Sequence, residues 1–260
     1  MTSLCYSLSD AWHWAAFSGD YNPIHFDESF ARTQGALALS VHGMRALLDV
    51  KRFVSPETAD APFIRCSVRL RQPLWCGDRY QLQQDTKKSG AVVLTPGPAG
   101  QTCISCQIAP ADRLPDDACA SQSTLSPALL TILQQSFAPL LPGAKQWHFL
   151  DALLFRHLIQ DDALLRQESV AAVLPPGSSL EALFASVPVV QTHQEAIFDA
   201  RLLADWDCCS PPEPLSIEIL PALVMGDLQQ GAIARIAART RYRDCAMTNA
   251  ITLKIGPAAV

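Results

Sequence analysis

The sequence HGMRALLDVKRFV at residues 42–54, followed closely by FIRCSVRLR at residues 63–71, decides which kind of fold this chain can adopt. The first segment predicts a helix over 43–54 whose apolar residues cover much of its circumference, and such a helix is buried rather than amphipathic. The second segment alternates apolar and polar residues, which is typical of a strand that is buried on one face only. Together they predict an α+β unit in which an antiparallel sheet covers a buried helix.

The segments that follow extend this predicted sheet. Strand-like runs lie at residues 80–84, 91–94 and 102–108, so the first 110 residues form one helix-and-sheet unit in this interpretation. The next stretch, residues 111–125, is rich in Asp, Ser, Ala and Pro, and that composition is typical of a linker.

The second half of the chain repeats features of the first. SVRLRQPLWCGD at residues 67–78 aligns without gaps with SIEILPALVMGD at residues 216–227, and four of the aligned positions are identical. Two copies of one helix-and-sheet unit are therefore the simplest architecture.

The remaining segments of the second half fit this interpretation only in part. THQEAIFDARLLADW at residues 192–206 predicts a helix, because a Thr followed three residues later by Glu has the spacing of a capping box. A strand-rich stretch at residues 232–255 follows it. Two further helical segments are not assigned to either copy, at residues 126–140 and 147–160.

The overall composition restricts the possible classes of function. The chain has 260 residues, of which 49% are hydrophobic and 17% are charged, so it can bury the cores of two domains. A net charge of −5 and a pI near 5.6 argue against a general nucleic-acid binder. No apolar run is long enough to span a bilayer, and the first residues lack the pattern of a signal peptide. We therefore expect a cytoplasmic protein without a membrane span.

The nine cysteines show no regular spacing. Because nine is odd, at least one of them cannot pair within the chain. Cys103 and Cys106 form a C-x-x-C, but a zinc site needs a second pair or a His at matching spacing. We therefore expect scattered buried thiols in a reducing cytoplasm, and no metal site.

A polar loop precedes the predicted buried helix. SGDYNPIHFD at residues 18–27 is dense in turn-forming residues. A turn can bring Asp20 and His25 to one site, whereas an extended strand would separate them by more than about 15 Å. A carboxylate and an imidazole placed together can hold a water molecule, remove its proton and return one. Taken alone, Asp20 is more often a turn or cap residue, and His25 a hydrogen-bonded structural histidine.

The loop and the helix start together carry a longer pattern. SGDYNPIHFD, with HGM beginning seventeen residues after His25, resembles the MaoC-like and (R)-specific enoyl-CoA hydratase family, whose pattern is S-G-D-x-N-P-x-H-x-D, a short spacer and H-G-M. Every fixed position of that pattern is present, and the resemblance covers about residues 10–80. It implies a hotdog fold, in which a long sheet wraps one central helix. Two tandem copies would make a double hotdog.

The resemblance implies a hydratase or dehydratase that interconverts 2-enoyl and 3-hydroxyacyl thioesters, as in fatty acid metabolism. The acyl group would be carried on coenzyme A or on an acyl carrier protein, without a metal or redox cofactor. Asp20 and His25 would be the catalytic acid–base pair, and Gly43 the donor to the thioester oxygen. The residues also favour that last role, because the first N–H groups of a helix are unpaired and carry the positive end of its dipole. The expected substrate-binding residues are Asn22, His42 and Met44.

The catalytic pattern is absent from the second half. The repeat alignment places the corresponding loop near residues 169–180, where no Asp–His pair occurs, and the helix predicted at residue 192 begins with Thr-His-Gln instead of His-Gly-Met. We therefore predict one active site, in an N-terminal hotdog. The predicted domains are the N-terminal hotdog at residues 1–115, a linker with a helix at 116–150, and a degenerate C-terminal hotdog at 151–260 that completes the pocket. Such a chain is a pseudo-dimer by itself, and the sequence leaves open whether two chains also form a homodimer.

Two other functions on this fold also stay open. One is a catalytically retired module that only holds an acyl thioester. The other is a thioesterase, which would keep a carboxylate but would not need the SGDYNPIH and HGM pair. The three arginines on the polar face of the strand at 63–71 also have two interpretations. Arg65, Arg69 and Arg71 either contact the phosphates of coenzyme A or of a phosphopantetheine arm, or form a solvated sheet face, which we favour.

Overall fold

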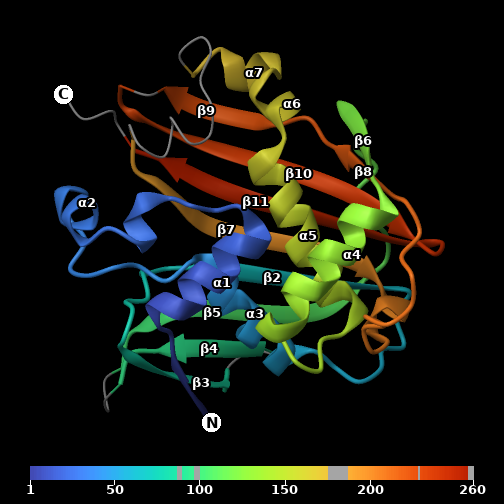
Figure 1. The fold of residues 1–260 in the computed structure, drawn as a ribbon, viewed down its shortest axis with the longest axis horizontal. Coiled ribbons are helices and arrows are strands. Elements are labelled where there is room, and N and C mark those ends of the chain that lie inside the picture. The colour runs from blue at the N-terminus through green and yellow to red at the C-terminus, as the bar shows by residue number, and fades with distance from the viewer. Residues whose placement is uncertain (87–89, 97–99, 175–186, 228, 257–260) are drawn as a thin grey trace.

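A single antiparallel sheet of eleven strands organises the chain (Figure 1). The computed structural model describes residues 1–260 except 87–89, 97–99, 175–186, 228 and 257–260. The strand order is β1-β3-β4-β5-β2-β7-β11-β10-β8-β6, and β9 also pairs with β10. The strands are Thr2–Cys5 (β1), Phe63–Leu70 (β2), Arg79–Gln84 (β3), Gly90–Leu94 (β4), Thr102–Ala111 (β5), Ser121–Leu125 (β6), Val189–Asp199 (β7), Leu215–Ile219 (β8), Leu223–Asp227 (β9), Gly231–Tyr242 (β10) and Cys245–Ile255 (β11).

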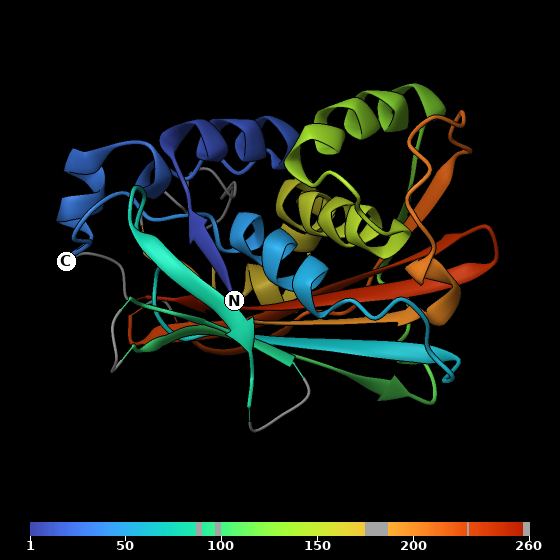
Figure 2. The ribbon, with the colours of Figure 1, turned by 90° about the horizontal axis from the view of Figure 1, so that it is seen from below.

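The longer helices gather on one face of this sheet, as Figure 2 shows for α1, α3, α4 and α5. The α-helices are Leu8–Ser18 (α1), Glu28–Thr33 (α2), Gly43–Val54 (α3), Pro127–Phe137 (α4), Gln146–Gln160 (α5), Asp162–Leu165 (α6) and Glu168–Ala171 (α7). Short 3-10 turns lie at Pro23–His25 (η1), Ala138–Leu140 (η2) and Ala200–Leu203 (η3).

The sheet consists of two similar halves that meet where β2 pairs with β7. Outward from this pair, the N-terminal half runs β2, β5, β4, β3, β1, and the C-terminal half runs β7, β11, β10, β8, β6. In each half one long helix, α3 or α5, precedes the central strand in the chain. Each half is thus a sheet around a central helix, and the chain has the double hotdog fold of the α+β class that its sequence predicts.

The predicted helix at 43–54 and strand at 63–71 are confirmed, but the helix is not buried all round, because Arg52 and Phe53 are exposed. Met44, Leu47 and Leu48 on α3 are at most 1% exposed. On β2, Ile64, Cys66 and Val68 are at most 3% exposed, whereas Arg65 and Arg69 are exposed. Removing a large aliphatic side chain from water contributes about 1.5–3 kcal/mol. The burial of this face therefore keeps α3 against the sheet.

The helix predicted at residues 192–206 is wrong. This segment is the greater part of β7 followed by η3, and β7 is hydrogen-bonded to β2 on one side and to β11 on the other. Gln194, Ala196 and Phe198 alternate along it with at most 2% exposure, which is the period of a strand. The capping-box spacing was misleading because two full ladders of backbone hydrogen bonds override local helix propensity.

The repeat alignment is also wrong in register. Residues 67–70 lie on β2, whose counterpart in the second half is β7, whereas residues 216–219 lie on β8, the counterpart of β3. The central helix of the C-terminal half is α5. The segment predicted as a linker at 116–150 contains β6, which pairs with β8 and belongs to the second half of the sheet.

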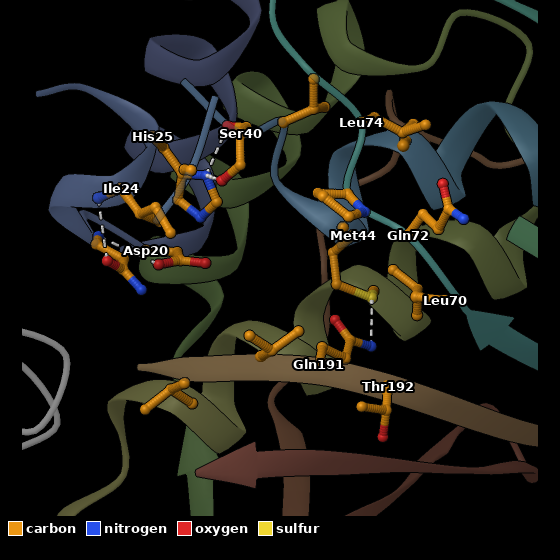
Figure 3. Close-up of a pocket in the computed structure, with 18 of the residues that line it drawn as sticks. Asp20, Ile24, His25, Ser40, Met44, Leu70, Gln72, Leu74, Gln191 and Thr192 are labelled. Carbon is orange, nitrogen blue, oxygen red and sulfur yellow. Dashed lines mark hydrogen bonds between the residues drawn. The ribbon is translucent and has the colours of Figure 1, made fainter. Parts of the chain in front are cut away.

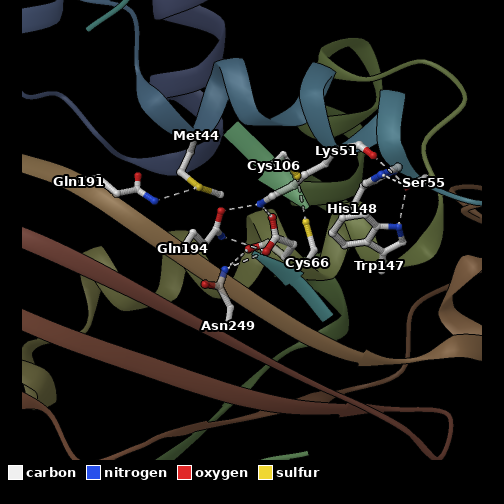
Figure 4. A network of polar contacts seen from close by, with 11 residues as sticks. Met44, Lys51, Ser55, Cys66, Cys106, Trp147, His148, Gln191, Gln194 and Asn249 are labelled. Carbon is white, nitrogen blue, oxygen red and sulfur yellow. Dashed lines mark hydrogen bonds and ion pairs between the residues drawn. The ribbon is translucent and has the colours of Figure 1, made fainter. Parts of the chain in front are cut away.

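A buried polar network joins the two central helices (Figure 4). The Lys51 ammonium of α3 forms an ion pair with the Asp151 carboxylate of α5, and both side chains are at most 1% exposed. Lys51 also donates to Gln194 Oε1 at 2.6 Å, while Gln194 and Asn249 donate to Asp151 Oδ1 at 3.1 and 3.0 Å. The carboxylate and the ammonium are thus surrounded by partners from both halves of the protein.

The predictions for the cysteines are confirmed in part. The nine cysteines are free thiols, and Cys103 and Cys106 of the C-x-x-C are buried on β5. The expectation that the thiols are buried is wrong for four of them, which are exposed: Cys5, Cys119, Cys208 and Cys209. Within the described residues, no helix is both long and apolar enough to cross a lipid bilayer.

Candidate active site

A chain of local hydrogen bonds shapes the loop that follows α1. The Ser18 hydroxyl accepts from the Asp20 N–H at 3.1 Å, Asp20 Oδ1 accepts from the Asn22 N–H at 3.3 Å, and Asn22 Oδ1 accepts from the Ile24 N–H at 3.2 Å. Side chains of Ser, Asp and Asn form such bonds to the backbone two residues ahead. The conformation of SGDYNPI is therefore set by hydrogen bonds within the segment. These bonds turn the Asp20 carboxylate toward the residues that follow.

Gly19 permits the sharp exit from α1 that begins this loop. It ends the helix with a φ of +78°, in the left-handed region that favours glycine. A Cβ at this position would lie 1.8 Å from the side-chain nitrogen of Gln160, which is part of α5. The backbone angle thus favours glycine here, whereas a shift of the flexible Gln160 side chain would relieve the contact.

His25 is held in one orientation by Ser40. Its Nδ1 lies 2.8 Å from the Ser40 carbonyl oxygen and 3.0 Å from the Ser40 hydroxyl. Because a carbonyl oxygen only accepts, the proton of the neutral ring is on Nδ1. This leaves the Nε2 lone pair free to act as a base on the side of Asp20.

His42 lies behind His25 rather than on the cavity wall. The two rings stack with centroids 3.7 Å apart, and His42 Nε2 donates to the Asp20 carbonyl oxygen at 3.0 Å. His42 is 1% exposed and does not line the cavity described below. It is placed to brace the loop and the His25 ring, whereas the sequence analysis expected a substrate contact.

Burial brings the pKa values of Asp20 and His25 closer together. It raises the pKa of Asp20 above its usual value, and it lowers the pKa of His25, while the charge of each partner opposes these changes. Burial also lowers the pKa of His42 well below its usual value. Burial therefore favours the neutral form of the His25 imidazole, which is the form that can accept a proton from water.

The same cluster is poorly arranged for a metal ion. One ligand atom each from Asp20, His25 and His42 lies within 4.8 Å of the others. The two imidazole rings are stacked with centroids 3.7 Å apart and 26° between their planes, so their in-plane lone pairs lie in two separate layers. A metal ion needs lone pairs that converge on one point. His25 Nδ1 and His42 Nε2 are moreover already hydrogen-bonded to carbonyl oxygens.

The start of α3 is the second element of the site. None of the described side chains caps its first turn, in contrast to α1, α2 and α4, which Ser7, Asp27 and Ser126 cap. Gly43 is the first residue of this uncapped helix. Its N–H lacks an intrahelical partner and carries the positive end of the helix dipole, so it can donate to an oxygen that gains negative charge.

A cavity of about 430 Å³ connects these elements and passes between the two halves of the protein (Figure 3). Of the residues predicted for the site, Asp20, Asn22, His25, Gly43 and Met44 line it. The C-terminal half completes its wall with Phe155, Ile159, Val189, Val190, Gln191, Thr192 and Leu253. The prediction that the degenerate half completes the pocket is therefore correct in its geometry.

The corresponding place in the C-terminal half lacks the acid–base pair. The loop between α4 and α5, residues 138–145, is the counterpart of the catalytic loop and contains neither Asp nor His. The expected position of that loop, near 169–180, lies partly outside the described residues, and α7 occupies its start. Trp147 stacks on Phe198, and Phe149 stacks on Trp206, over the start of α5. A more open hollow beside the start of α5 is lined by Lys145, Arg201 and Asp205 among others, and it has no counterpart of the Asp20 and His25 pair.

The three arginines on or just after β2 have different surroundings. Arg65 lies 3.7 Å from the Glu195 carboxylate on β7, as part of the exposed face of the sheet. Arg69 is the register partner of His193 on the same face. Arg71 lines the cavity, so it is the arginine nearest to any ligand there. The phosphate contact stays a prediction.

Two residues of the site were not identified from the sequence. Ser40 orients His25, and the SVHGM segment offered a signal because it places a hydroxyl two residues before His42. Gln191 enters the cavity from β7. It was missed because it lies just before residues 192–206, which were predicted as a helix and not as part of a strand beside the site.

Comparisons with known proteins relate the N-terminal part of the chain to one domain family. Residues 3–92 match the model of the MaoC like domain family. A curated relative, the mitochondrial 3-hydroxyacyl-[acyl-carrier-protein] dehydratase of Arabidopsis thaliana, is 34% identical over 73 residues, which are 28% of this chain and 44% of that protein. The matching part thus spans less than half the length of this relative.

Solved structures similar to the whole chain are more distant. A MaoC-like dehydratase from Phytophthora capsici is 11% identical with a TM-score of 0.41, covering 99% of this chain and 95% of that one. A conserved hypothetical protein of Mycobacterium tuberculosis with a double hotdog fold is 11% identical with a TM-score of 0.44, covering 97% and 94%. Residues 3–92, which include the catalytic loop and the start of α3, are therefore similar to the MaoC like domain, and this match covers about a third of the chain.

Proposed function

We propose that this protein is a hydratase or dehydratase that interconverts 2-enoyl and 3-hydroxyacyl thioesters carried on coenzyme A or on an acyl carrier protein. The observation that carries the proposal is the convergence of Asp20, His25 and the uncapped start of α3 on one cavity between the two halves. An acid–base pair and an oxyanion donor are the two elements that this reaction needs.

In the hydration direction, a water molecule held between Asp20 and His25 attacks C3 of the enoyl group. The pair takes one proton from this water as the C3–O bond forms, and a proton is returned to C2 as the C2–C3 double bond becomes a single bond. Negative charge develops on the thioester oxygen during the attack. The Gly43 N–H at the positive end of α3 stabilises that charge. The reverse sequence removes water from the 3-hydroxyacyl thioester.

The direct test is product analysis after incubation of the purified protein with crotonyl-CoA and with a medium-chain 2-enoyl-CoA, and with the same acyl groups on a carrier protein. Loss of the conjugated enoyl absorbance with formation of a 3-hydroxyacyl thioester would support the proposal. Release of free thiol would indicate a thioesterase. An unchanged thioester that nevertheless binds to the folded protein would indicate a binding module, and either of these results contradicts the proposal.

The pH dependence of kcat/KM is expected to have an acid limb below the ordinary His pKa of about 6.5. Burial lowers the pKa of His25, so the neutral, proton-accepting ring persists to a lower pH than that of a solvent-exposed histidine. Steady-state rates between pH 4.5 and 8.5 would check this. A midpoint above pH 7 would contradict it.

Unfolding at low pH has to be separated from this loss of activity. Burial lowers the pKa of His42, and it lowers the pKa of His148 to about 3. Below pH 6.5 the unfolded chain therefore binds more protons on these histidines than the folded protein does, so they make the protein less stable as the pH falls. Circular dichroism at each pH identifies the range in which the fold is intact.

A further inference from the structure

Gln191 reaches the start of α3 from the opposite half of the protein (Figure 3). It lies on β7, and its side chain lines the cavity. Its Nε2 is 3.7 Å from Met44 Sδ, and its Oε1 is 3.5 Å from the position that a Cβ on Gly43 would occupy. The carboxamide thus contacts the first turn of α3, where the thioester oxygen is proposed to lie.

The hydrogen-bonding capacity of this carboxamide is almost unused. A glutamine amide offers two donors and a carbonyl acceptor, and among the described residues the partner of Gln191 is a thioether sulfur, which is a weak acceptor. The neighbouring polar residues of β7 differ in this respect. Thr192 donates to the Thr252 carbonyl oxygen at 3.2 Å, and Gln194 bonds to Lys51 and Asp151.

The walls beside Gln191 are apolar. The other contact of a Cβ on Gly43 would be Leu70 Cδ2 at 2.8 Å, and Leu253 and Val189 also line this side of the cavity. A half-buried amide in such surroundings forms a strong hydrogen bond with a ligand, because few competing partners are present. The group that must approach Gly43 in the proposed reaction is a thioester carbonyl, and the amide N–H groups of Gln191 are complementary to it.

We propose that the Gln191 carboxamide is a second hydrogen-bond donor to the thioester carbonyl oxygen, opposite the Gly43 N–H. This inference rests on the proposed function and assigns a substrate-contacting residue to the half that lacks the catalytic motif. As water adds to C3, negative charge gathers on the carbonyl oxygen, and a donor on each side stabilises it. The amide exchanges its contact with Met44 for this bond, which strengthens as the charge develops.

Two variants of Gln191 distinguish donation from packing. Gln191→Met keeps a similar volume without a donor, and Gln191→Glu keeps the shape while replacing the NH₂ group by an oxygen. We expect kcat to fall about 10- to 100-fold in Gln191→Met and further in Gln191→Glu, with KM changed by less than about threefold. Gln122→Met is the matched control, because Gln122 lies on β6, is exposed and bonds to Ser216. Its kcat should equal that of the parent.

A spectroscopic measurement tests the contact itself. Butyryl-CoA labelled with ¹³C at the carbonyl cannot be hydrated, and its carbonyl stretch moves to lower wavenumber when donors bind the oxygen. We expect the stretch of the bound ligand to lie at higher wavenumber in folded Gln191→Met than in the parent. An active parent with an unchanged kcat or an unchanged carbonyl band in this variant would overturn the inference alone. A parent without hydratase activity would overturn the proposed function, and the inference with it.

Discussion

Replacement of Asp20 by Asn is expected to lower kcat/KM for 2-enoyl thioester hydration by at least about 100-fold, because general acid–base catalysis contributes about 10²- to 10⁴-fold. Asparagine retains an oxygen that can accept the Asn22 N–H, as Asp20 Oδ1 does at 3.3 Å, so the loop should keep its shape. What is lost is the negative charge beside His25 and the ability to exchange a proton. Steady-state rates with crotonyl-CoA measure the effect.

His25→Ala is expected to lower kcat/KM by a similar factor. The double variant of Asp20 and His25 should have a kcat/KM little lower than that of either single variant. Groups that act as a unit in one step give non-additive losses. A variant of Asp20 that kept more than a tenth of the parent rate would contradict the assignment of this pair.

Asp27→Asn is the matched control for Asp20→Asn. Asp27 belongs to the same motif, but its carboxylate accepts from the Phe30 N–H at 3.0 Å and caps α2 at the surface. Asparagine and aspartate are equally good at the N-cap position. We expect this variant to keep the parent rate within about twofold, and melting temperatures of the parent and both Asn variants to agree within a few degrees.

Asp151→Leu is expected to destabilise the protein by about 3–5 kcal/mol, because it leaves the Lys51 ammonium buried without a counter-charge. Burial raises the pKa of Asp151, and the attraction of Lys51 opposes that effect. In this protein the ion pair joins α3 of one half to α5 of the other, so its loss weakens the contact between the halves. Urea unfolding followed by circular dichroism measures the free-energy difference.

The double variant Lys51→Met/Asp151→Leu separates the cost of an unpaired charge from the value of the pair. Removing both charges takes away the desolvation penalty of each, so we expect less than half of the loss caused by Asp151→Leu. Glu28→Ala is the surface control, because Glu28 and Arg32 form an exposed ion pair whose loss should leave the melting temperature almost unchanged. A stable Asp151→Leu protein, or a double variant less stable than the single one, would contradict this account.

The short-range parts of the site could be predicted from the sequence. Asp20, His25 and Gly43 lie within 24 residues, and their positions depend on turn residues that bond to their own backbone and on the start of a buried helix. These interactions are encoded in neighbouring residues. The motif was therefore sufficient to predict that Asp20, His25 and Gly43 lie at one cavity, although it did not identify Ser40 and placed His42 there as well.

The tertiary structure decided the rest, since it depends on partners that are distant in the chain. Residues 192–206 carry a local pattern that fits a helix, but residues 192–199 form a strand, because β2 and β11 satisfy their backbone on both sides. This strand pairing brings the Gln191 side chain close to Gly43 from the other half of the protein. It also leaves α5 as the helix that meets Lys51 through Asp151. Local propensities amount to tenths of a kcal/mol per residue, whereas long-range ladders and buried charges involve several kcal/mol, so the long-range contacts prevail where the two disagree.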